Sequence, residues 1–352
     1  MAIKKVTIRD VAREAGVSVT LVSFVMNAKP LKDGRLDCPV NPDTAQRVLQ
    51  VAKRLGYRRN NAAASLRSGR SHAIAVIVSD LANQFFSEIC RHIERVAYKE
   101  GYTVIFASSE ENAEKLGKLV ETMIGFNVEG MILAPCLDAE NTISRLSNVG
   151  IPTVIFDRDI PGKEFGRVLV DNVDAGYMAT KYLIHQGFGK IEMISYQSGV
   201  TSLTDREVGY KKAMEEAGLG DDARLHRIGY DVSLAKKDVI GIFRDALKRG
   251  TEAFVQPTKK IGLYGFNALN VLGLSSQKDI SFVCFDESDI VDISKPAVPH
   301  IVQPVAEIAE KSYELLRSMI EEKVCDEGRF VSLKAKLELG GRFGVEPTAA
   351  TF

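Results

Sequence analysis

Short apolar runs alternate with amphipathic stretches along most of the chain. Runs of strand length lie at residues 73–78, 103–107, 130–134, 153–156, 168–170, 191–194 and 281–285. Between them, apolar residues recur at helical spacing, for example at Ile89, Ile93 and Val96. Alternating strands and helices with nearly continuous apolar strands predict parallel sheets that helices cover on both faces. A segment this long predicts two doubly wound lobes, and ligands of open α/β sheets bind beyond the carboxyl ends of the strands. We therefore expect a binding site between the two lobes.

The first 56 residues show another pattern, which predicts three short helices. Thr7 has an acidic residue three positions on, as in a capping box. Gly16 allows a sharp turn, and Ser18 can cap the helix that follows it. A third helix is predicted to begin at Asn41 and Pro42. Two short helices joined by a tight glycine turn are typical of a helix-turn-helix, whose second helix enters the major groove of DNA. A plain three-helix domain is the alternative.

A DNA-binding head would present the outward positions of the second helix and the residues at the helix N-termini. These candidates are Thr7, Ser18, Val19, Thr20, Ser23, Phe24, Asn27 and Thr44. The charge of the segment agrees with a polyanionic partner. Residues 1–71 contain 14 Lys and Arg but only 5 Asp and Glu, a net charge of +9, whereas the chain as a whole is neutral. A solubilising surface is the alternative explanation of this charge.

Composition places the chain among globular proteins of two or three structural units. It has 352 residues, of which 45% are apolar and 26% charged. No apolar run reaches the roughly 18 residues of a membrane span, and the N-terminus lacks a signal-peptide pattern, so we expect a cytoplasmic protein. The five cysteines and five histidines are scattered, without a C-x-x-C pair. We therefore expect reduced thiols, no metal site and no cofactor.

Residues 6–27, VTIRDVAREAGVSVTLVSFVMN, closely resemble the DNA-binding signature of the LacI (LacI/GalR) family of transcriptional regulators. The resemblance continues over nearly the whole chain, through VSDLANQFF at 78–86, VIFDR at 154–158, VDN at 170–172, REVGY at 206–210, ISFVCFDE at 280–287 and IVQP at 301–304. It implies a helix-turn-helix head on a two-lobed body similar to the type I periplasmic binding proteins.

The segment YRRNNAAASLRSG at 57–69 resembles the hinge of this family, which forms a short helix in the minor groove. By position, Asn60 would cap that helix, Ala63 would face the groove and Leu66 would wedge between bases. A helix this short is marginal in water, and an apolar wedge kinks the duplex and adds contacts. A simple flexible linker is the alternative.

The resemblance also implies an effector pocket. By position its residues are Asn83, Phe86, Asp157, Arg206, Thr258 and Asp286. Carboxylates that accept from vicinal hydroxyls, a planar arginine fork and an aromatic ring suit a sugar. Each side chain also has a structural alternative. The two aspartates could cap helices, and the arginine could form an ion pair at the surface.

Several positions depart from the family pattern. Phe24 stands where arginine is usual, so the operator sequence does not carry over from relatives. Arg59 replaces the usual proline of the hinge. In FVQPTKK at 254–260, Thr258 and Lys259 replace a usual Asn-Asp pair. The lysines there could favour an acidic sugar or a sugar phosphate, or they could simply be exposed residues at the start of a helix.

We therefore expect a DNA-binding transcriptional regulator, a repressor of sugar-metabolism genes controlled by a small-molecule effector. Two-fold symmetry would make it a homodimer on a pseudo-palindromic operator. A sugar-sensing protein without operator recognition is the alternative. No G-x-S-x-G elbow, P-loop or G-x-G-x-x-G fingerprint occurs, so we do not expect an enzyme.

The predicted boundaries follow from these readings. They are a head at 1–56, a hinge at 57–71, a body at 72–346 and a loose tail at 347–352. Within the body, the first lobe would combine 72–170 with 302–332, and the second would combine 171–301 with 333–346.

Overall fold

The computed structural model describes residues 6–28, 36–57, 70–160, 165–287, 291, 294, 296–322 and 329–339. Contacts divide the chain between Ser71 and His72 into two compact units, called the head and the body below.

The head contains the three predicted helices, α1 (Ile8–Ala15), α2 (Val19–Asn27) and α3 (Pro42–Arg54). Their buried faces form one small core, made of Val11, Ala12, Ala15, Val22, Val25, Ala45, Val48, Val51 and Ala52. Gly16 has φ 65°, a left-handed conformation that glycine adopts without steric cost, and it ends α1 directly before the turn into α2.

Local hydrogen bonds start these helices where the sequence predicts. The Asp10 carboxylate accepts from the backbone N–H and the hydroxyl of Thr7, at 2.9 and 2.7 Å. The Ser18 hydroxyl accepts from the Leu21 amide at 3.2 Å, and Asn41 caps α3 in the same way.

The first lobe of the body has a six-stranded parallel sheet in the order β11-β5-β4-β3-β1-β2. Its strands are β1 (Ala73–Val78), β2 (Thr103–Ser108), β3 (Gly130–Leu133), β4 (Thr153–Phe156), β5 (Gly166–Val170) and β11 (Phe330–Leu333). The predicted strands at 73–78 and 153–156 are confirmed residue for residue. The edge strand β11 comes from the end of the chain, so this lobe is built from two separate stretches of sequence.

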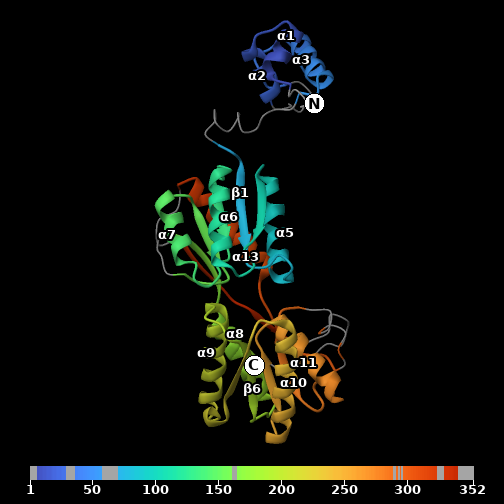
Figure 1. Cartoon of the computed structure of the whole chain (residues 1–352), viewed down its shortest axis with the longest axis vertical. Helices are drawn as coiled ribbons and strands as arrows, with labels where there is room; N and C mark the ends of the chain where they lie inside the picture. The colour runs from blue at the N-terminus through green and yellow to red at the C-terminus, as the bar shows by residue number, and fades with distance from the viewer. Residues whose placement is uncertain are drawn as a thin grey trace. The chain divides into compact units, whose positions relative to one another are not determined.

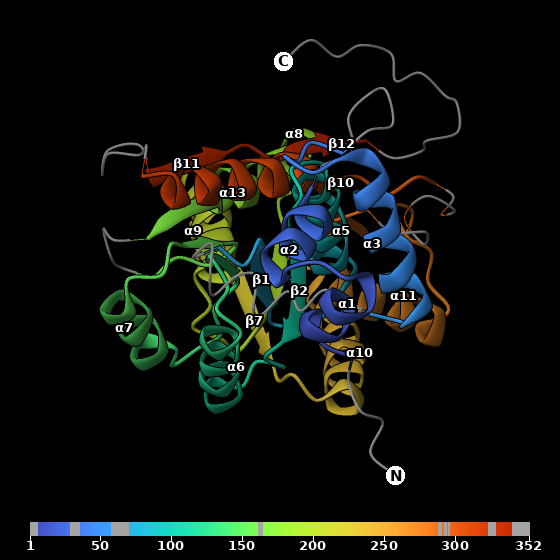
Figure 2. The ribbon, with the colours of Figure 1, turned by 90° about the horizontal axis from the view of Figure 1, so that it is seen from above.

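Helices cover both faces of this sheet, as Figure 2 shows from above. They are α5 (Gln84–Lys99) and α13 (Val305–Ile320) on one face, and α6 (Ala113–Gly125) and α7 (Glu140–Val149) on the other. Alternate residues of β1 point to opposite faces. Ile74 and Val76 pack with α5 and α13, whereas Ala75 and Ile77 pack with α6 and α7.

The second lobe repeats this plan with one difference. Its sheet order is β12-β10-β9-β8-β6-β7, and the predicted parallel pairing is confirmed except at the edge, where β12 is antiparallel to β10. The strands are β6 (Ile191–Tyr196), β7 (Arg224–Ile228), β8 (Ala253–Gln256), β9 (Ser281–Phe285), β10 (His300–Val302) and β12 (Lys336–Glu338).

Helices of the described ranges flank both faces of this second sheet (Figure 1), and a short 3-10 turn spans Gly220–Asp222. They are α8 (Asn172–His185) and α9 (Thr201–Glu216) on one face, and α10 (Val232–Arg249) and α11 (Lys259–Leu272) on the other. No helix in the described ranges is long and apolar enough to cross a membrane.

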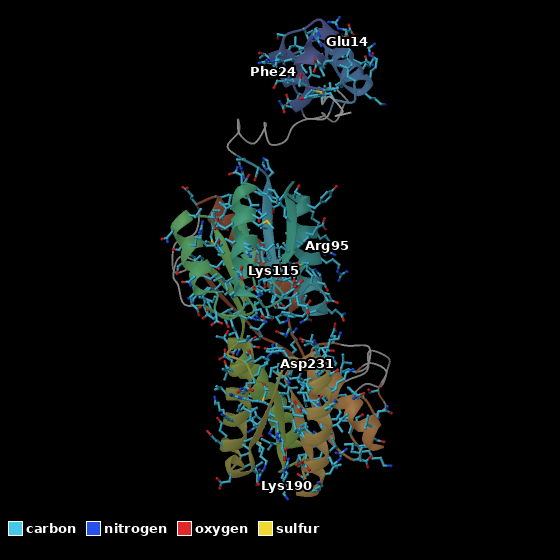
Figure 3. The ribbon with its side chains drawn as sticks, viewed as in Figure 1. Glu14, Phe24, Arg95, Lys115, Lys190 and Asp231 are labelled. Atoms are coloured by element: carbon cyan, nitrogen blue, oxygen red, sulfur yellow. The ribbon has the colours of Figure 1, made fainter. Side chains whose placement is uncertain are left out.

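The strand directions bring the carboxyl ends of the second sheet toward the first lobe. Lys190, just before β6, lies at the far end of the second lobe in Figure 3, whereas Asp231, just after β7, lies at the end nearer the first lobe. Residues that directly follow the strands are therefore the ones that can meet across the two lobes.

Candidate functional site

The candidate DNA-reading helix α2 buries one face and exposes the other. Val22 and Val25 lie in the head core, whereas Thr20, Phe24 and Val19 are exposed. Among the remaining candidates, Thr7, Ser18 and Asn27 are exposed, and Ser23 and Thr44 are half-buried. The hinge candidates Asn60, Ala63 and Leu66 lie outside the described residues.

In the body, two aspartates occupy equivalent positions in the two lobes. Asp157 directly follows Phe156 at the end of β4, and Asp286 directly follows Phe285 at the end of β9. Both have φ 67°, in the left-handed region that non-glycine residues seldom adopt. Strained backbone of this kind clusters at functional sites. The repeated conformation makes both strand ends candidates for a functional site.

Arg206, on α9, is buried at 4% exposure and is held on three sides. Its Nε donates to Asn172 at 2.8 Å, its Nη1 donates to the Pro257 carbonyl at 2.6 Å, and its guanidinium lies 4.3 Å from the ring centre of Phe285. Burial lowers the pKa of the guanidinium, and the carboxylates of Asp286 and Asp157 oppose this effect. The side chain is therefore a buried cation held in one orientation, on which the charges of two acids act, and the alternative of a surface ion pair is wrong.

Asp157 lies within the same electrostatic cluster. Burial raises the pKa of its carboxyl, whereas the charges of Arg158 and Arg206 lower it. The Arg158 guanidinium forms two hydrogen bonds of 2.6 Å with Glu111 and a third of 3.0 Å with the Pro135 carbonyl. This bidentate pairing fixes a second planar cation beside the aspartate.

Asp286 contributes to a small cavity of about 80 Å³ that residues of both lobes line. Its carboxylate accepts from the side-chain amide of Gln303 at 2.7 Å, and the Gln303 side-chain oxygen is buried without a hydrogen-bond partner. Phe85 of the first lobe and Lys259 of the second also line the cavity. The Lys259 ammonium donates to the side-chain oxygen of Gln84, which joins the two lobes directly.

Three of the predicted effector residues have other roles in the structure. Asn83 is exposed and accepts from the Phe85 amide as the N-cap of α5, and Thr258 caps α11 by accepting from Ile261 at 3.1 Å. Phe86 is only 3% exposed and packs edge-to-face on Phe156 in the core. Its ring has no open face for a sugar, so we correct this assignment, and the neighbouring Phe85 is the ring that lines the cavity.

Three further residues of this cluster, Arg158, Asn172 and Gln303, were not predicted from the sequence. Each lies within a segment that carries the family resemblance, at 154–158, 170–172 and 301–304. The family resemblance could therefore have indicated these residues. Their partners are distant in sequence: Glu111 and Pro135 are 47 and 23 residues from Arg158, and Arg206 is 34 residues from Asn172. Sequence spacing alone does not reveal such pairs.

The chemistry of the cluster is suited to binding a polar ligand. It combines carboxylate acceptors, guanidinium donors and an amide, which together match a ligand rich in hydroxyl groups. No group of three or more metal-ligating side chains occurs within the described residues.

Models of known protein families match both the head and the body of the chain. Residues 7–60 match the model of bacterial regulatory proteins of the lacI family, and residues 74–324 match the model of the periplasmic binding protein domain. Of solved structures, the Lac repressor bound to ONPG superposes with a TM-score of 0.79 at 21% identity, covering 95% of this chain and 98% of that one. This similarity establishes the fold.

Two curated relatives extend over nearly the full length. The transcriptional regulator RegA of Clostridium saccharobutylicum is 30% identical over 92% of this chain and 96% of its own. The transcriptional repressor PurR of Vibrio vulnificus is 30% identical over 92% of this chain and 95% of its own. These relatives are regulators of transcription rather than enzymes. With a head, a two-lobed body and full-length relatives of this kind, the chain belongs to the lacI family of bacterial regulatory proteins.

Proposed function

We propose that this protein is a transcriptional repressor of sugar-metabolism genes whose affinity for operator DNA is set by a small molecule bound between the two lobes. It acts as a homodimer on a pseudo-palindromic operator in the cytoplasm, where the DNA lies. The division into head, hinge and body at 1–56, 57–71 and 72–346 is part of this proposal. So are the minor-groove roles of Asn60, Ala63 and Leu66.

The observation that carries the effector assignment is the buried Arg206, on which the charges of Asp286 and Asp157 act. A pair of acceptors around a fixed donor fork favours a ligand with vicinal hydroxyls, which is a sugar or a sugar derivative. A candidate ribose operon repressor from Burkholderia thailandensis supports this ligand class. It is 28% identical, with a TM-score of 0.69, and covers 77% of this chain and 100% of that one. Phe85 replaces Phe86 as the ring that would cover the apolar face of the sugar.

Control by the ligand would follow from linkage between the site and the lobe arrangement. The Lys259 ammonium donates to the Gln84 side chain, and the backbone amide of Asp159 donates to the Thr201 hydroxyl at 2.9 Å, so groups of the two lobes already meet beside the site. A ligand that contacts both lobes binds best to one arrangement of them. It can alter DNA affinity only through that difference.

A DNA-binding titration tests the proposal. Full-length protein is titrated against the DNA upstream of its own gene and against random duplexes at several salt concentrations, beside a fragment that begins at His72. Selective binding that weakens steeply with salt and is lost in the fragment is the expected result. A sugar screen by thermal shift on both proteins then identifies the effector.

Two results would contradict the proposal. Equal, weak binding of upstream and random DNA, with and without the sugars, would favour a sugar sensor without operator recognition. Selective DNA binding that no sugar changes, together with no thermal shift by any sugar, would exclude the sugar class and leave the DNA-binding function intact.

A further inference from the structure

The outward face of α2 carries no charged side chain. The helix reads VTLVSFVMN, without Lys, Arg, Asp or Glu. Exposed helix faces are normally rich in charged residues. Here the face presents Phe24 at 50% exposure and Val19 at 41%. An uncharged face with an exposed aromatic ring, on the helix proposed to meet DNA, can bind its partner only by apolar contacts and neutral hydrogen bonds.

Helix geometry places Phe24 opposite the core. At about 100° per residue, Thr20, Ser23, Phe24 and Asn27 share the side away from Val22 and Val25. The observed burial agrees with this geometry, because Val22 and Val25 lie in the head core. Figure 3 marks Phe24 on the head. Its ring therefore lies on the side of α2 that faces away from the head core and is open to a partner.

Two polar residues of this face, Asn27 and Ser23, bond to each other. The Asn27 side-chain amide donates to the Ser23 carbonyl at 2.6 Å and to the Ser23 hydroxyl at 3.1 Å. A bidentate contact of Asn with adenine requires that same amide as a donor. The Ser18 hydroxyl is used to cap the helix. Base reading by α2 therefore depends mainly on Thr20, Phe24 and Val19.

We propose that α2 reads thymine methyl groups through Phe24, and that the operator half-site carries a thymine, not a guanine, at the base pair that Phe24 faces. This inference rests on the proposed DNA-binding function. Arginine recognises guanine by two hydrogen bonds, whereas a phenylalanine ring has no hydrogen-bonding group, and its typical base contact in the major groove is with the C5 methyl group of thymine. The net charge of +9 on residues 1–71 supplies attraction to phosphate, so α2 is left to supply apolar discrimination.

The test begins with full-length protein and a pool of random duplexes, from which bound sequences are selected. In the selected site, each thymine is then replaced singly by deoxyuridine, which removes only the methyl group. We expect one symmetric pair of thymines to be sensitive. Its replacement should weaken binding about fourfold in each half-site, or about fifteenfold in both, the effect of one buried methyl group.

Variants assign this effect to Phe24. In Phe24→Ala the same replacement should have no effect. In the control Leu49→Ala, which removes an exposed apolar side chain from α3, the sensitivity should remain. Phe24→Arg should shift the selected base at this position to guanine by about tenfold.

The outcomes separate this inference from the function on which it rests. If no sequence is selected, the DNA-binding function fails and the inference fails with it. If a site is selected but guanine stands at the position that Phe24→Ala affects, or no deoxyuridine replacement matters, the inference alone is overturned. If Phe24→Ala changes self-association in sedimentation but not base preference, the face is a protein contact and the inference is likewise overturned.

Discussion

At the scale of single residues, the candidate effector site depends on side chains that chemically similar amino acids cannot replace. Arg206 uses two different nitrogens for two partners, Asn172 and the Pro257 carbonyl, while its plane lies over Phe285. A lysine ammonium is a single point donor on a flexible stem and cannot reproduce that planar arrangement. The orientation of the cation, and not only its charge, defines the site.

Replacing Arg206 by lysine should therefore abolish most of the ligand affinity. Loss of one charge-assisted hydrogen bond costs about 2 kcal/mol, so the sugar that raises the Tm of the wild type should bind about 30-fold more weakly or not at all. Titration calorimetry measures this directly. Arg145→Lys, at a surface ion pair with Glu121, is the control and should bind like the wild type. Unchanged affinity in Arg206→Lys would remove the arginine from the site.

At the scale of elements, two glycines set the contact between α8 and α9. A Cβ on Gly209 would lie 2.1 Å from the Val173 carbonyl oxygen, and one on Gly176 would lie 2.2 Å from the Arg206 carbonyl oxygen. A side chain at either position would therefore force α8 and α9 away from each other. Because Arg206 is on α9 and its partner Asn172 is on α8, this close packing also positions the candidate site.

Gly209→Ala should separate the two helices. We expect a loss of about 2 kcal/mol in the free energy of unfolding, typical of overpacking, together with weaker sugar binding. Gly241→Ala, in α10 where nothing lies within 4 Å of the added Cβ, is the matched control. It should stabilise by about 0.5–1 kcal/mol. Urea unfolding of both variants checks this, and equal stabilities would show that the helices adjust freely.

A buried acid links other elements of the second lobe. Glu192 of β6 accepts from Thr251 at 2.6 Å and from Arg249 at 2.8 Å, and it lies 2.5 Å from His226 of β7. Burial alone would raise the pKa of Glu192, but the hydrogen bonds from His226, Arg249 and Thr251 outweigh it and lower the pKa from 4.5 to about 2. The folded state therefore prefers the ionised form.

This preference predicts a pH dependence. An acid whose pKa is lower in the folded state stabilises the protein above its unfolded pKa, and that contribution is lost as the pH falls from about 4.5 toward 2. Glu192→Gln should cost about 3 kcal/mol at pH 7, and the difference from the wild type should shrink over that acid range. Urea unfolding from pH 7 down to the lowest pH at which both proteins fold measures it. The exposed Glu114→Gln serves as the control, and a pH-independent difference would contradict the assignment.

At the scale of the whole molecule, the head and the body have separate cores. The head core contains only residues between Val11 and Ala52, whereas one core of the body includes residues of both lobes, such as Ile74 and Met193. The two lobes should therefore unfold together, and the head by itself. A small domain buries a smaller fraction of its surface and is correspondingly less stable.

Calorimetry should accordingly record two transitions for the full chain. The lower one should disappear in the fragment that begins at His72, while the upper one should stay within a few degrees of its original Tm. Addition of the sugar should raise only the upper transition, because the ligand binds the folded body. A single transition, or a fragment that fails to fold, would show that head and body depend on each other.

Much of this architecture could be predicted because its signals are local. The strands β1, β4 and β9 are continuous apolar runs, and Thr7, Ser18 and Asn41 cap the helices of the head. The strand β7 (Arg224–Ile228) was missed because its sequence RLHRI carries charges along a partly exposed edge. The strands β10 and β12 have only three residues each, too few for a pattern.

The sequence by itself determined the helix starts of the head, the alternation of strands and helices, and the placement of Asp157 and Asp286 at strand ends. These follow from interactions within a few residues along the chain. Only the tertiary structure decided that Phe86 is buried while Phe85 lines the cavity, that β12 runs antiparallel, and that Arg206 reaches the Pro257 carbonyl. Those outcomes depend on which distant surfaces pack together, and no local pattern in the sequence records that choice.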